Sequence, residues 1–351
     1  MAYSSITKPS LHFNTKLYTG NGSTNAISSV GHQPDLVWLK ERSSAGAGLL
    51  FDAVRTATKF VRSSDSAAEV TAADTLTAFN SDGFTLGADA SNYAANQNSE
   101  TYASWNWKAG GGQGSSNTDG SINTTYTSVN TTAGFSIVKY TGNQTSGASV
   151  GHGLGVAPKM ILVKSLSEAH AWRVYHKSVG ATKELYLNLT NVPYTATNVW
   201  NDQEPTSSVF YLGNNDSGTN KSGVTYVAYC FAEKTGYSKI GSYTGNGSTD
   251  GTFTYLGFKP AMIIIKRTDT AKNWYLHDSK RDGYNNDNPY LSPNLSAAET
   301  GGTEIDILSN GFKLRASGTG HNESGGTYIY MAFAEEPLVA NVGASIPATA
   351  R

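Results

Sequence analysis

The chain repeats itself three times, and this repetition constrains its fold more than any other feature of the sequence. Four short motifs recur in the same order. Tyr-Thr-Gly-Asn occupies residues 18–21, 140–143 and 243–246. A proline with a lysine six positions later occupies residues 34–40, 158–164 and 260–266. Ser-(Asp/Asn)-Gly-Phe occupies residues 81–84 and 309–312, with a looser copy at 207–210, and an aromatic segment closes each copy at 101–107, 225–231 and 327–333.

The motif spacing gives a unit of about 100 residues and predicts the domain boundaries. We expect an N-terminal segment at 1–12, a first repeat at 13–109, a linker at 110–132, a second repeat at 133–235, a third repeat at 236–337 and a C-terminal tail at 338–351. The linker is assigned because Gly, Ser, Asn and Thr dominate it, a composition typical of flexible or extended connections.

Within each copy the sequence predicts short strands joined by tight turns. The apolar run at 261–265 follows a proline and ends at a lysine, as a strand buried on both faces does. Asn-Gly or Asp-Gly pairs, typical of tight hairpins, stand at 21–22, 82–83, 246–247 and 310–311. Long helices are not predicted. We therefore expect an all-β protein made of three tandem copies of an antiparallel β-sandwich or jelly-roll-like unit.

The composition limits the possible partners. The 351 residues include 26 Lys and Arg against 27 Asp and Glu, a formal charge of −1, so we expect no nucleic-acid binding, which needs a basic surplus. The first residues carry no secretory signal and no window approaches 18 apolar residues, so we expect neither Sec export nor membrane insertion. Cys230 has no disulfide partner in the chain. Polar units without disulfides need additional burial, and we expect a homo-oligomer, specifically a trimer.

Catalytic patterns are sparse. Residues 147–151 fit Gly-x-Ser-x-Gly, but a nucleophile elbow needs a strand before the serine and a helix after it, whereas a Gly-rich segment and Pro158 follow here. Glycoside hydrolysis needs two carboxylates flanking a cleft, and Glu299, Glu304 and Asp306 are candidates in the third copy alone. We predict that the protein is not an enzyme and has no catalytic residues, with a recruited hydrolase as the minor alternative.

Metal and cofactor motifs are equally weak. The seven histidines are scattered rather than grouped at the spacings of a zinc site. The Asn/Asp-rich loops at 214–218 and 282–287 offer oxygen atoms that suit Ca²⁺, although such loops are also common turns. We predict no bound metal and no cofactor.

Three tryptophans are the candidate ligand-binding residues. An aromatic face stacks on sugar rings, and neighbouring Asn and Asp side chains bind sugar hydroxyls. Trp172 and Trp274 occupy matching positions of two copies, so the alternative is that both belong to the core. Trp200 has no counterpart in the other copies, which makes it the preferred surface residue.

The repeated motifs together resemble a β-domain found in structural proteins of marine tailed bacteriophages. The resemblance covers nearly the whole chain, including residues 110–132 and the closing Ala-Phe-Ala-Glu-Glu-Pro at 332–337. The family is largely uncharacterised and includes virion proteins of the tail-fibre and decoration types. The resemblance implies a component on the surface of the phage particle, synthesised in the host cytoplasm, whose partners are other tail or capsid proteins. It carries no catalytic or binding residues.

Two roles remain open within this resemblance. The preferred one is a tail-associated fibre or adhesin that binds a host-surface glycan, and the alternative is a capsid decoration protein that stabilises the head. A heptad run or shaft repeat is missing, which favours a compact adhesin or a decoration protein over a long fibre. A polysaccharide depolymerase ranks third, because the 100-residue period does not fit short β-helical coils.

Overall fold

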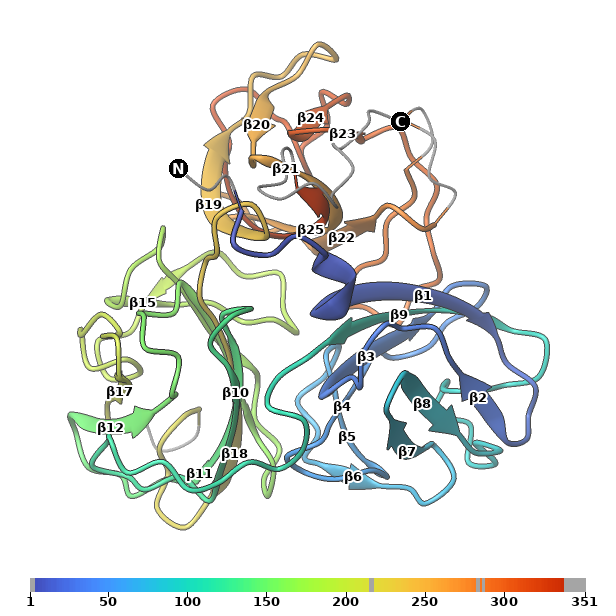
Figure 1. Cartoon of the computed structure of the whole chain (residues 1–351). Helices are drawn as coiled ribbons and strands as arrows, with labels where there is room; N and C mark the ends of the chain where they lie inside the picture. The colour runs from blue at the N-terminus through green and yellow to red at the C-terminus, as the bar shows by residue number, and fades with distance from the viewer. Residues whose placement is uncertain (1–3, 215–217, 282–284, 286–287, 338–351) are drawn as a thin grey trace.

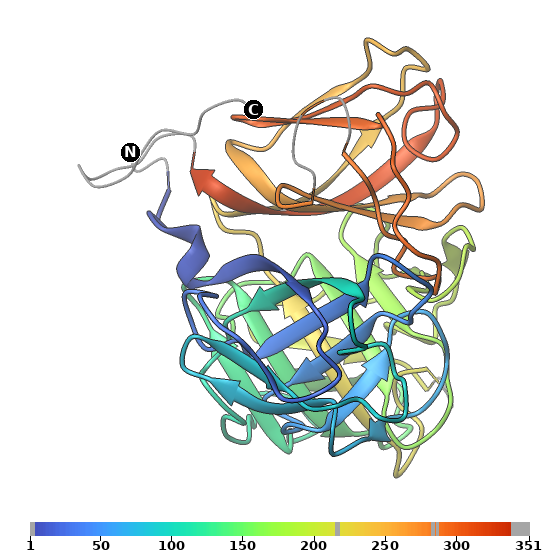
Figure 2. The same ribbon diagram turned by 90° about the vertical axis from the view of Figure 1, so that its right-hand side faces the viewer.

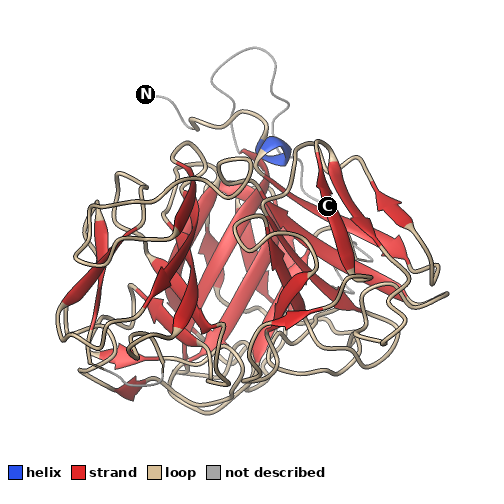
Figure 3. Ribbon diagram, turned by 90° about the horizontal axis from the view of Figure 1, so that it is seen from below, coloured by secondary structure: helices blue, strands red, loops and turns tan. Residues whose placement is uncertain are grey.

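The computed structural model describes residues 4–214, 218–281, 285 and 288–337. These residues form strands and loops, with one short 3-10 helix, η1 (Pro9–Leu11), ahead of the first strand (Figure 3). All the strand pairs are antiparallel. The prediction of an all-β, antiparallel sandwich fold is confirmed.

Three main sheets share one order of four strands, to which the first sheet adds two strands and the second adds one. The first runs β1 (Phe13–Thr19), β9 (Thr101–Trp107), β3 (Leu36–Glu41), β4 (Leu49–Asp52), β5 (Lys59–Arg62) and β6 (Val70–Thr71). The second runs β10 (Tyr126–Asn130), β11 (Phe135–Thr141), β18 (Thr225–Phe231), β13 (Met160–Ser165) and β14 (Arg173–His176). The third runs β19 (Ser238–Thr244), β25 (Thr327–Pro337), β21 (Phe258–Arg267) and β22 (Trp274–Asp278). In each sheet the closing aromatic segment lies beside the proline-led strand.

A smaller sheet covers the outer face of each main sheet. These sheets are β2 (Asn25–Ile27), β8 (Gly83–Leu86) and β7 (Leu76–Asn80); β12 (Ala148–Gly151) and β17 (Val209–Leu212); and β20 (Phe253–Tyr255), β24 (Gly311–Leu314) and β23 (Ile305–Leu308). A further hairpin pairs β15 (Lys183–Glu184) with β16 (Tyr194–Thr195). We name residues 13–109, 110–235 and 236–337 lobes 1, 2 and 3. Figure 1 shows the three lobes around a common centre.

Residues 110–132 differ from the expected linker. They carry β10, which pairs with β11 at the edge of the second main sheet, and Ile122 is buried in the core of lobe 2. Ser115 bridges to Thr127, and the Gly110 amide donates to Ser128 Oγ at 3.0 Å. The Gly/Ser-rich segment therefore folds onto lobe 2 because a few apolar and hydroxyl side chains anchor it.

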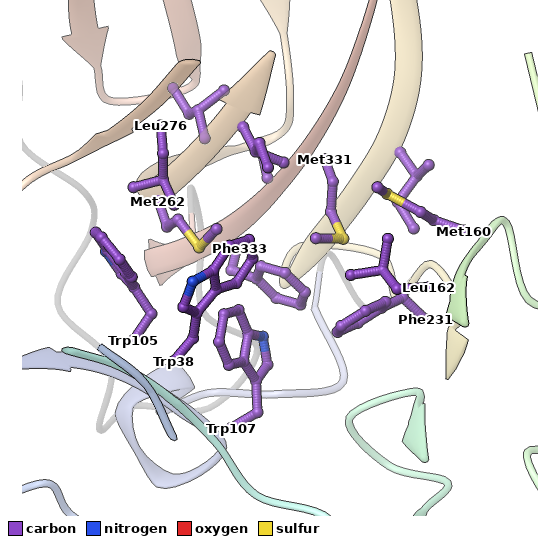
Figure 4. Close-up of a cluster of buried hydrophobic side chains, with 14 of the residues drawn as sticks. Trp38, Trp105, Trp107, Met160, Leu162, Phe231, Met262, Leu276, Met331 and Phe333 are labelled. Atoms are coloured by element: carbon purple, nitrogen blue, oxygen red, sulfur yellow. The ribbon is translucent and has the colours of Figure 1, made fainter. Parts of the chain in front are cut away.

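The centre of the molecule is an aromatic core shared by all three lobes. Among its members are two aromatic side chains from each lobe, namely Phe13 and Trp107, Phe135 and Phe231, and Tyr237 and Phe333. Trp107 meets Phe231 and Phe333 with ring centroids 6.2 and 5.6 Å apart, and Phe231 meets Phe333 at 5.9 Å (Figure 4). Each such aromatic pair adds about 0.5–1.5 kcal/mol beyond the burial of its area.

This shared core changes the reason for expecting a trimer. We expected association of chains because one polar, disulfide-free unit gains little burial alone. Here a single chain brings three lobes together and buries one continuous cluster across them. The short helix η1 lies against β1 and β25. It therefore covers the end of the core at which β25 ends (Figure 2). The burial that motivated a trimer is thus present within one chain.

The Tyr-Thr-Gly-Asn motif makes the same stabilising contacts in each lobe. Tyr18 stacks on Tyr102 with centroids 4.9 Å apart, and its hydroxyl donates to the Ala95 carbonyl at 2.8 Å. The Asn96 side chain accepts from the Asn21 amide at 3.2 Å. Gly20 is required between them, because a Cβ there would lie 2.1 Å from the Gln97 carbonyl oxygen. The same contacts recur in the other lobes through Tyr140 with Tyr226 and Asn220, and through Tyr243 with Tyr328 and Asn322.

The lysine of the proline-led motif joins neighbouring lobes. Its amino group donates to backbone carbonyls, one of which belongs to the next lobe around the centre. These are Lys40 to Leu295 at 2.8 Å, Lys164 to Ser66 at 3.1 Å and Lys266 to Thr190 at 3.1 Å. Burial lowers the pKa of each of the three lysines to about 8. The repeated lysine is therefore explained by its role in closing the ring of lobes.

Two of the three seams between lobes contain buried ion pairs. In lobe 1, Arg55 Nε donates to Asp52 at 2.5 Å, and the Tyr229 hydroxyl of lobe 2 donates to the same carboxylate at 2.7 Å. In lobe 3, Arg281 Nε donates to Asp278 at 2.6 Å, and the indole of Trp105 from lobe 1 donates to that carboxylate at 3.1 Å. In each seam a donor from the adjacent lobe completes the pair.

The third seam, between lobes 2 and 3, has an uncharged residue in place of the buried aspartate, and we call it the neutral seam. His176 occupies the strand position that Asp52 and Asp278 occupy in the other two lobes. Each of the three residues pairs with the equivalent residue of its proline-led strand, which is Met160, Leu36 or Met262. Its Nε2 lies 3.3 Å from the Tyr330 carbonyl oxygen of lobe 3. Burial lowers the pKa of His176 to about 4, so the imidazole is uncharged at neutral pH.

Candidate functional site

The three tryptophans predicted to bind a ligand are buried. Trp172, Trp200 and Trp274 are 0, 2 and 1 % exposed. A ring without an open face cannot stack on a sugar, so this prediction is wrong for all three residues. The alternative that Trp172 and Trp274 are core residues agrees with their burial.

Two of these tryptophans lie at seams between lobes. The indole N–H of Trp172 donates to the Arg62 carbonyl of lobe 1 at 2.7 Å, and that of Trp274 donates to the Tyr186 carbonyl of lobe 2 at 2.8 Å. Trp200 packs inside lobe 2, where its ring meets Tyr175 edge-on with centroids 6.0 Å apart. Its lack of a counterpart in the other copies reflects a local difference in core packing.

The carboxylates considered for hydrolysis are held in ion pairs or lie apart. Glu299 receives hydrogen bonds from Arg42 at 2.9 Å and from Arg281 at 2.8 Å across the seam between lobes 1 and 3. Asp306 pairs with Arg315 on the small sheet of lobe 3. Burial raises the pKa of Glu304. Glu299 is thus a seam residue, and the structure does not bring the three carboxylates together around a cleft.

Ser149, the serine of the Gly-x-Ser-x-Gly pattern, lies within strand β12. Its Oγ accepts from the Ser121 amide at 3.0 Å, and its own amide donates to Ser121 Oγ at 2.9 Å. A nucleophile elbow instead places its serine on a turn between a strand and a helix. The pattern here belongs to a strand edge that residues 121–122 cover.

A polar hollow in lobe 1 contains one pair of carboxyl groups. Glu41, Ser44, Asn92, Gln97 and Glu100 contribute to its lining. Burial raises the pKa of Glu41, and the nearby carboxyl group of Glu100 raises it further. A neighbouring serine donates to each carboxyl group, Ser44 to Glu41 and Ser43 to Glu100. Both carboxyl groups therefore have local hydrogen-bond partners.

Metal-binding side chains do not cluster within the described part of the chain, where no three His, Cys, Asp or Glu residues converge. The Nε2 atoms of His277 and His321 lie 3.1 Å apart, and burial lowers the pKa of both histidines. Most of the two loops considered for Ca²⁺, at 214–218 and 282–287, lies outside the described residues.

The outward face of β20 in lobe 3 is the candidate functional site. Phe253 and Tyr255 are 44 and 53 % exposed, while Thr254 between them points inward. Alternate residues of a strand face the same side, so the two rings lie side by side on the solvent face of the small sheet. β20 lies on the side of lobe 3 away from the common centre (Figure 1). We name these two residues the β20 aromatic face.

Charged side chains border the β20 aromatic face. The Lys239 amino group lies 5.4 Å from the centroid of the Tyr255 ring and donates to the Tyr255 carbonyl at 2.6 Å. Lys313 lies opposite Phe253 on β24 and pairs with Asp250 at 2.5 Å. The hydrogen bond from Lys313 lowers the pKa of Asp250, which stays ionised. Two aromatic rings beside ammonium and carboxylate groups form an amphipathic surface that suits a polar ligand with apolar faces.

Only lobe 3 carries aromatic residues at these two positions. In each small sheet one residue of the edge strand pairs with a phenylalanine of the neighbouring strand. That residue is Ile27 in lobe 1, Val150 in lobe 2 and Thr254 in lobe 3. The residues that correspond to Phe253 and Tyr255 are therefore Ala26 and Ser28 in lobe 1, and Ser149 and Gly151 in lobe 2. Position-by-position comparison of the three copies is the sequence signal that would have found this site.

Comparison with known proteins gives a family but no activity. The model of a domain of unknown function, DUF7483, matches residues 8–337. No curated protein matches the chain. The described residues include no helix with the length and apolar character needed to cross a bilayer. Since the family model spans nearly the whole chain, the protein belongs to the DUF7483 family.

Proposed function

We propose that the protein is a non-enzymatic structural component on the surface of a bacteriophage particle, a tail-associated adhesin that contacts the host surface through the β20 aromatic face. The observation that carries this proposal is the exposure of Phe253 and Tyr255 on a small sheet whose counterparts in the other lobes bear small side chains. A binding residue differs between copies, whereas residues that build the scaffold recur in all of them.

The scaffold supports a binding role because its other notable side chains have structural partners. The repeated lysines bind carbonyls of adjacent lobes, and the Asp–Arg pairs are buried in seams. These contacts hold the small sheet of lobe 3 on a rigid body, which reduces the entropy lost when a ligand is bound. The antiparallel sheets also differ from the parallel β-helix that a depolymerase of the tail-spike type would need.

The ligand class we propose is a glycan of the host surface. Aromatic rings contact the apolar faces of sugars, while Lys239, Lys313 and Asp250 are placed to bind hydroxyl or charged substituents. The test is binding of the purified chain to host cell envelopes and to extracted surface polysaccharide. Phe253→Ala with Tyr255→Ala should reduce binding at least about tenfold.

A double change in lobe 1, Ala26→Thr with Ser28→Thr, is the control. The lobe 1 variant alters the corresponding outer positions without touching the β20 aromatic face and should bind normally. Equal binding by wild type and the β20 variant would contradict the glycan proposal.

A decoration role on the capsid is the second candidate, and the closed three-lobed shape supports it. The lobes surround one core instead of extending along a shaft (Figure 2). Electron microscopy of particles labelled with antibody against the chain separates the candidates. Label at the tail supports the adhesin, and label over the head supports decoration. Particles without label would contradict both.

A further inference from the structure

β20 is the edge strand of its sheet. On its free edge, the Tyr255 carbonyl accepts from Lys239 Nζ, and the other outward main-chain groups have no partner among the described residues. The strand order is β20-β24-β23. Thr252 and Leu256 bond toward β24, since the Leu314 amide donates to the Thr252 carbonyl at 3.0 Å and the Leu256 amide donates to the Asn310 carbonyl at 2.9 Å. By the alternation of an antiparallel ladder, the main-chain groups of Phe253 and Tyr255 point to the open edge.

The equivalent edge in lobe 2 is covered by the chain itself. There the Ile122 amide donates to the Ser149 carbonyl at 2.9 Å, and Ile122 bridges to Val150. Residues 110–125 supply this cover because the connection from β9 to β10 is long. The connection from β18 to β19, residues 232–237, is short and leads directly into lobe 3. β20 is open for that reason.

The β20 edge lacks the protection that natural edge strands usually have. Exposed edges are commonly blunted by charged residues, proline or a bulge within the strand. β20 instead presents Phe253 and Tyr255, and Lys239 contacts only the last carbonyl. The corresponding strand of lobe 1 ends differently. It carries Ala26 and Ser28 at the outer positions and therefore offers no comparable apolar contact.

A second observation concerns the hydroxyl of Thr254. Its Oγ1 is buried and has no hydrogen-bond partner among the described residues. A buried hydroxyl without a partner is unfavourable, so a partner is expected in the complete assembly. Thr254 lies at the centre of β20, on the side of the sheet that faces inward.

We propose that β20 pairs antiparallel with β20 of a second copy of this chain, which joins two three-stranded sheets into one of six strands. A twofold axis at Thr254 places Phe253 of each copy opposite Tyr255 of the other. These two pairs exchange main-chain hydrogen bonds, with the Phe253 amide of the other copy replacing Lys239 as the donor to the Tyr255 carbonyl. The aromatic side chains form favourable cross-strand pairs.

The same axis places the two Thr254 residues opposite each other as a non-hydrogen-bonded pair. Their Cα atoms are then about 4.5 Å apart, and the two hydroxyls can bond to each other. The pairing therefore satisfies the buried Oγ1 atoms and the open main-chain groups together. It also makes a surface of four aromatic rings, so each copy completes the binding face of the other. An isologous contact of this kind gives a dimer, in place of the trimer expected from the sequence.

The first test is sedimentation equilibrium of the full chain between roughly 0.1 and 100 µM. Wild type should sediment as a dimer at the upper end of this range. Phe253→Lys with Tyr255→Lys places like charges opposite each other and should weaken association at least about 100-fold. Ala26→Lys with Ser28→Lys adds the same charge at the corresponding strand of lobe 1 and should leave the dimer intact. A monomer at every concentration, or a dimer that the β20 lysines do not affect, would overturn the proposal.

The second test fixes the register. Thr254→Cys should form a disulfide between copies on mild oxidation, because Cα atoms of such a pair lie within disulfide range. Cys230 is buried, and burial raises the pKa of its thiol to about 12, so it should not react. Ile27→Cys, at the corresponding position of lobe 1, should give no linked dimer. Linkage of both variants alike, or of neither, would contradict this pairing. The pairing is independent of the glycan proposal, since a dimer that binds no host glycan refutes only that proposal.

Discussion

The ionic seam between lobes 3 and 1 and the neutral seam between lobes 2 and 3 occupy equivalent places but use different chemistry. In the ionic seam, Asp278 and Arg281 are fully buried and the Trp105 indole completes their hydrogen bonds. In the neutral seam, His176 takes the place of the aspartate. Val179 stands three residues after His176, as Arg281 stands three residues after Asp278, and it packs against the central core.

The difference follows from what the adjacent lobe presents at the seam. Trp105 and Tyr229 each bring a hydrogen-bond donor to a buried carboxylate, whereas the matching residue of lobe 3 is Met331, which has no donor. Burying a carboxylate without hydrogen-bond donors costs free energy. The uncharged His176 and Val179 are therefore compatible with Met331 at this seam. The two kinds of seam therefore specify which lobe faces which.

Removing one partner of a buried ion pair should have the largest effect. Arg281→Met leaves Asp278 buried without its counter-charge and should lower the free energy of unfolding by about 3–5 kcal/mol. Urea denaturation at pH 7 measures the change. The adjacent Lys280→Ala removes a charge that is largely exposed and should cost less than about 1 kcal/mol. Equal effects of the two variants would show that the seam does not depend on its buried pair.

Acid should weaken the neutral seam through protonation of His176. The pKa of His176 is about 4 in the folded chain against about 6.5 when unfolded, so the unfolded state binds the proton first as pH falls. The stability contributed by the neutral imidazole is complete above pH 6.5 and is lost as pH falls toward 4. At pH 4.5 the loss should be about 2–3 kcal/mol.

Comparison with His176→Asn isolates this effect from the other titrating groups. The asparagine is neutral throughout, so the variant should lose less stability than wild type between pH 7 and pH 4.5. Parallel urea titrations at the two pH values give the difference. Identical pH dependence in the two proteins would contradict the assignment to His176.

Removing a single donor should have the smallest effect. Tyr229→Phe keeps the ring but removes the hydroxyl, which donates to Asp52 at 2.7 Å and accepts from Arg55 at 3.1 Å. We expect a loss of about 1–2 kcal/mol by thermal unfolding, since the ion pair itself remains. Met331→Leu, at the matching position of the neutral seam, keeps the volume and should cost less. A larger cost for Met331→Leu would reverse the comparison.

Much of the fold could be predicted from the sequence, because the recurring motifs encode local structure. The apolar runs form central strands, and the repeated Tyr, Gly and Asn positions make the same stacking and hydrogen-bond contacts in each lobe. The linker prediction failed because composition alone does not reveal that Ile122 reaches the core of lobe 2. The seams depend on contacts between residues more than 100 positions apart, such as Asp52 with Tyr229, which no local pattern indicates.

The candidate site was missed for a related reason. Trp200 drew attention as a large aromatic residue without a counterpart, yet its burial beside Tyr175 depends on the tertiary arrangement of lobe 2. Phe253 and Tyr255 are ordinary strand residues in isolation. Their significance appears only when strand register shows which face they occupy and that the other lobes carry small residues there.

The most direct test of whether the three lobes share one core is differential scanning calorimetry of the wild-type chain, compared with Phe333→Ala. We predict a single cooperative transition, because Phe333 of lobe 3 packs on Phe13 and Trp107 of lobe 1 and on Phe231 of lobe 2. Truncation of Phe333 should shift that whole transition to lower temperature, at a cost of about 3–5 kcal/mol. Separate transitions, with only one of them moved by Phe333→Ala, would contradict a shared core.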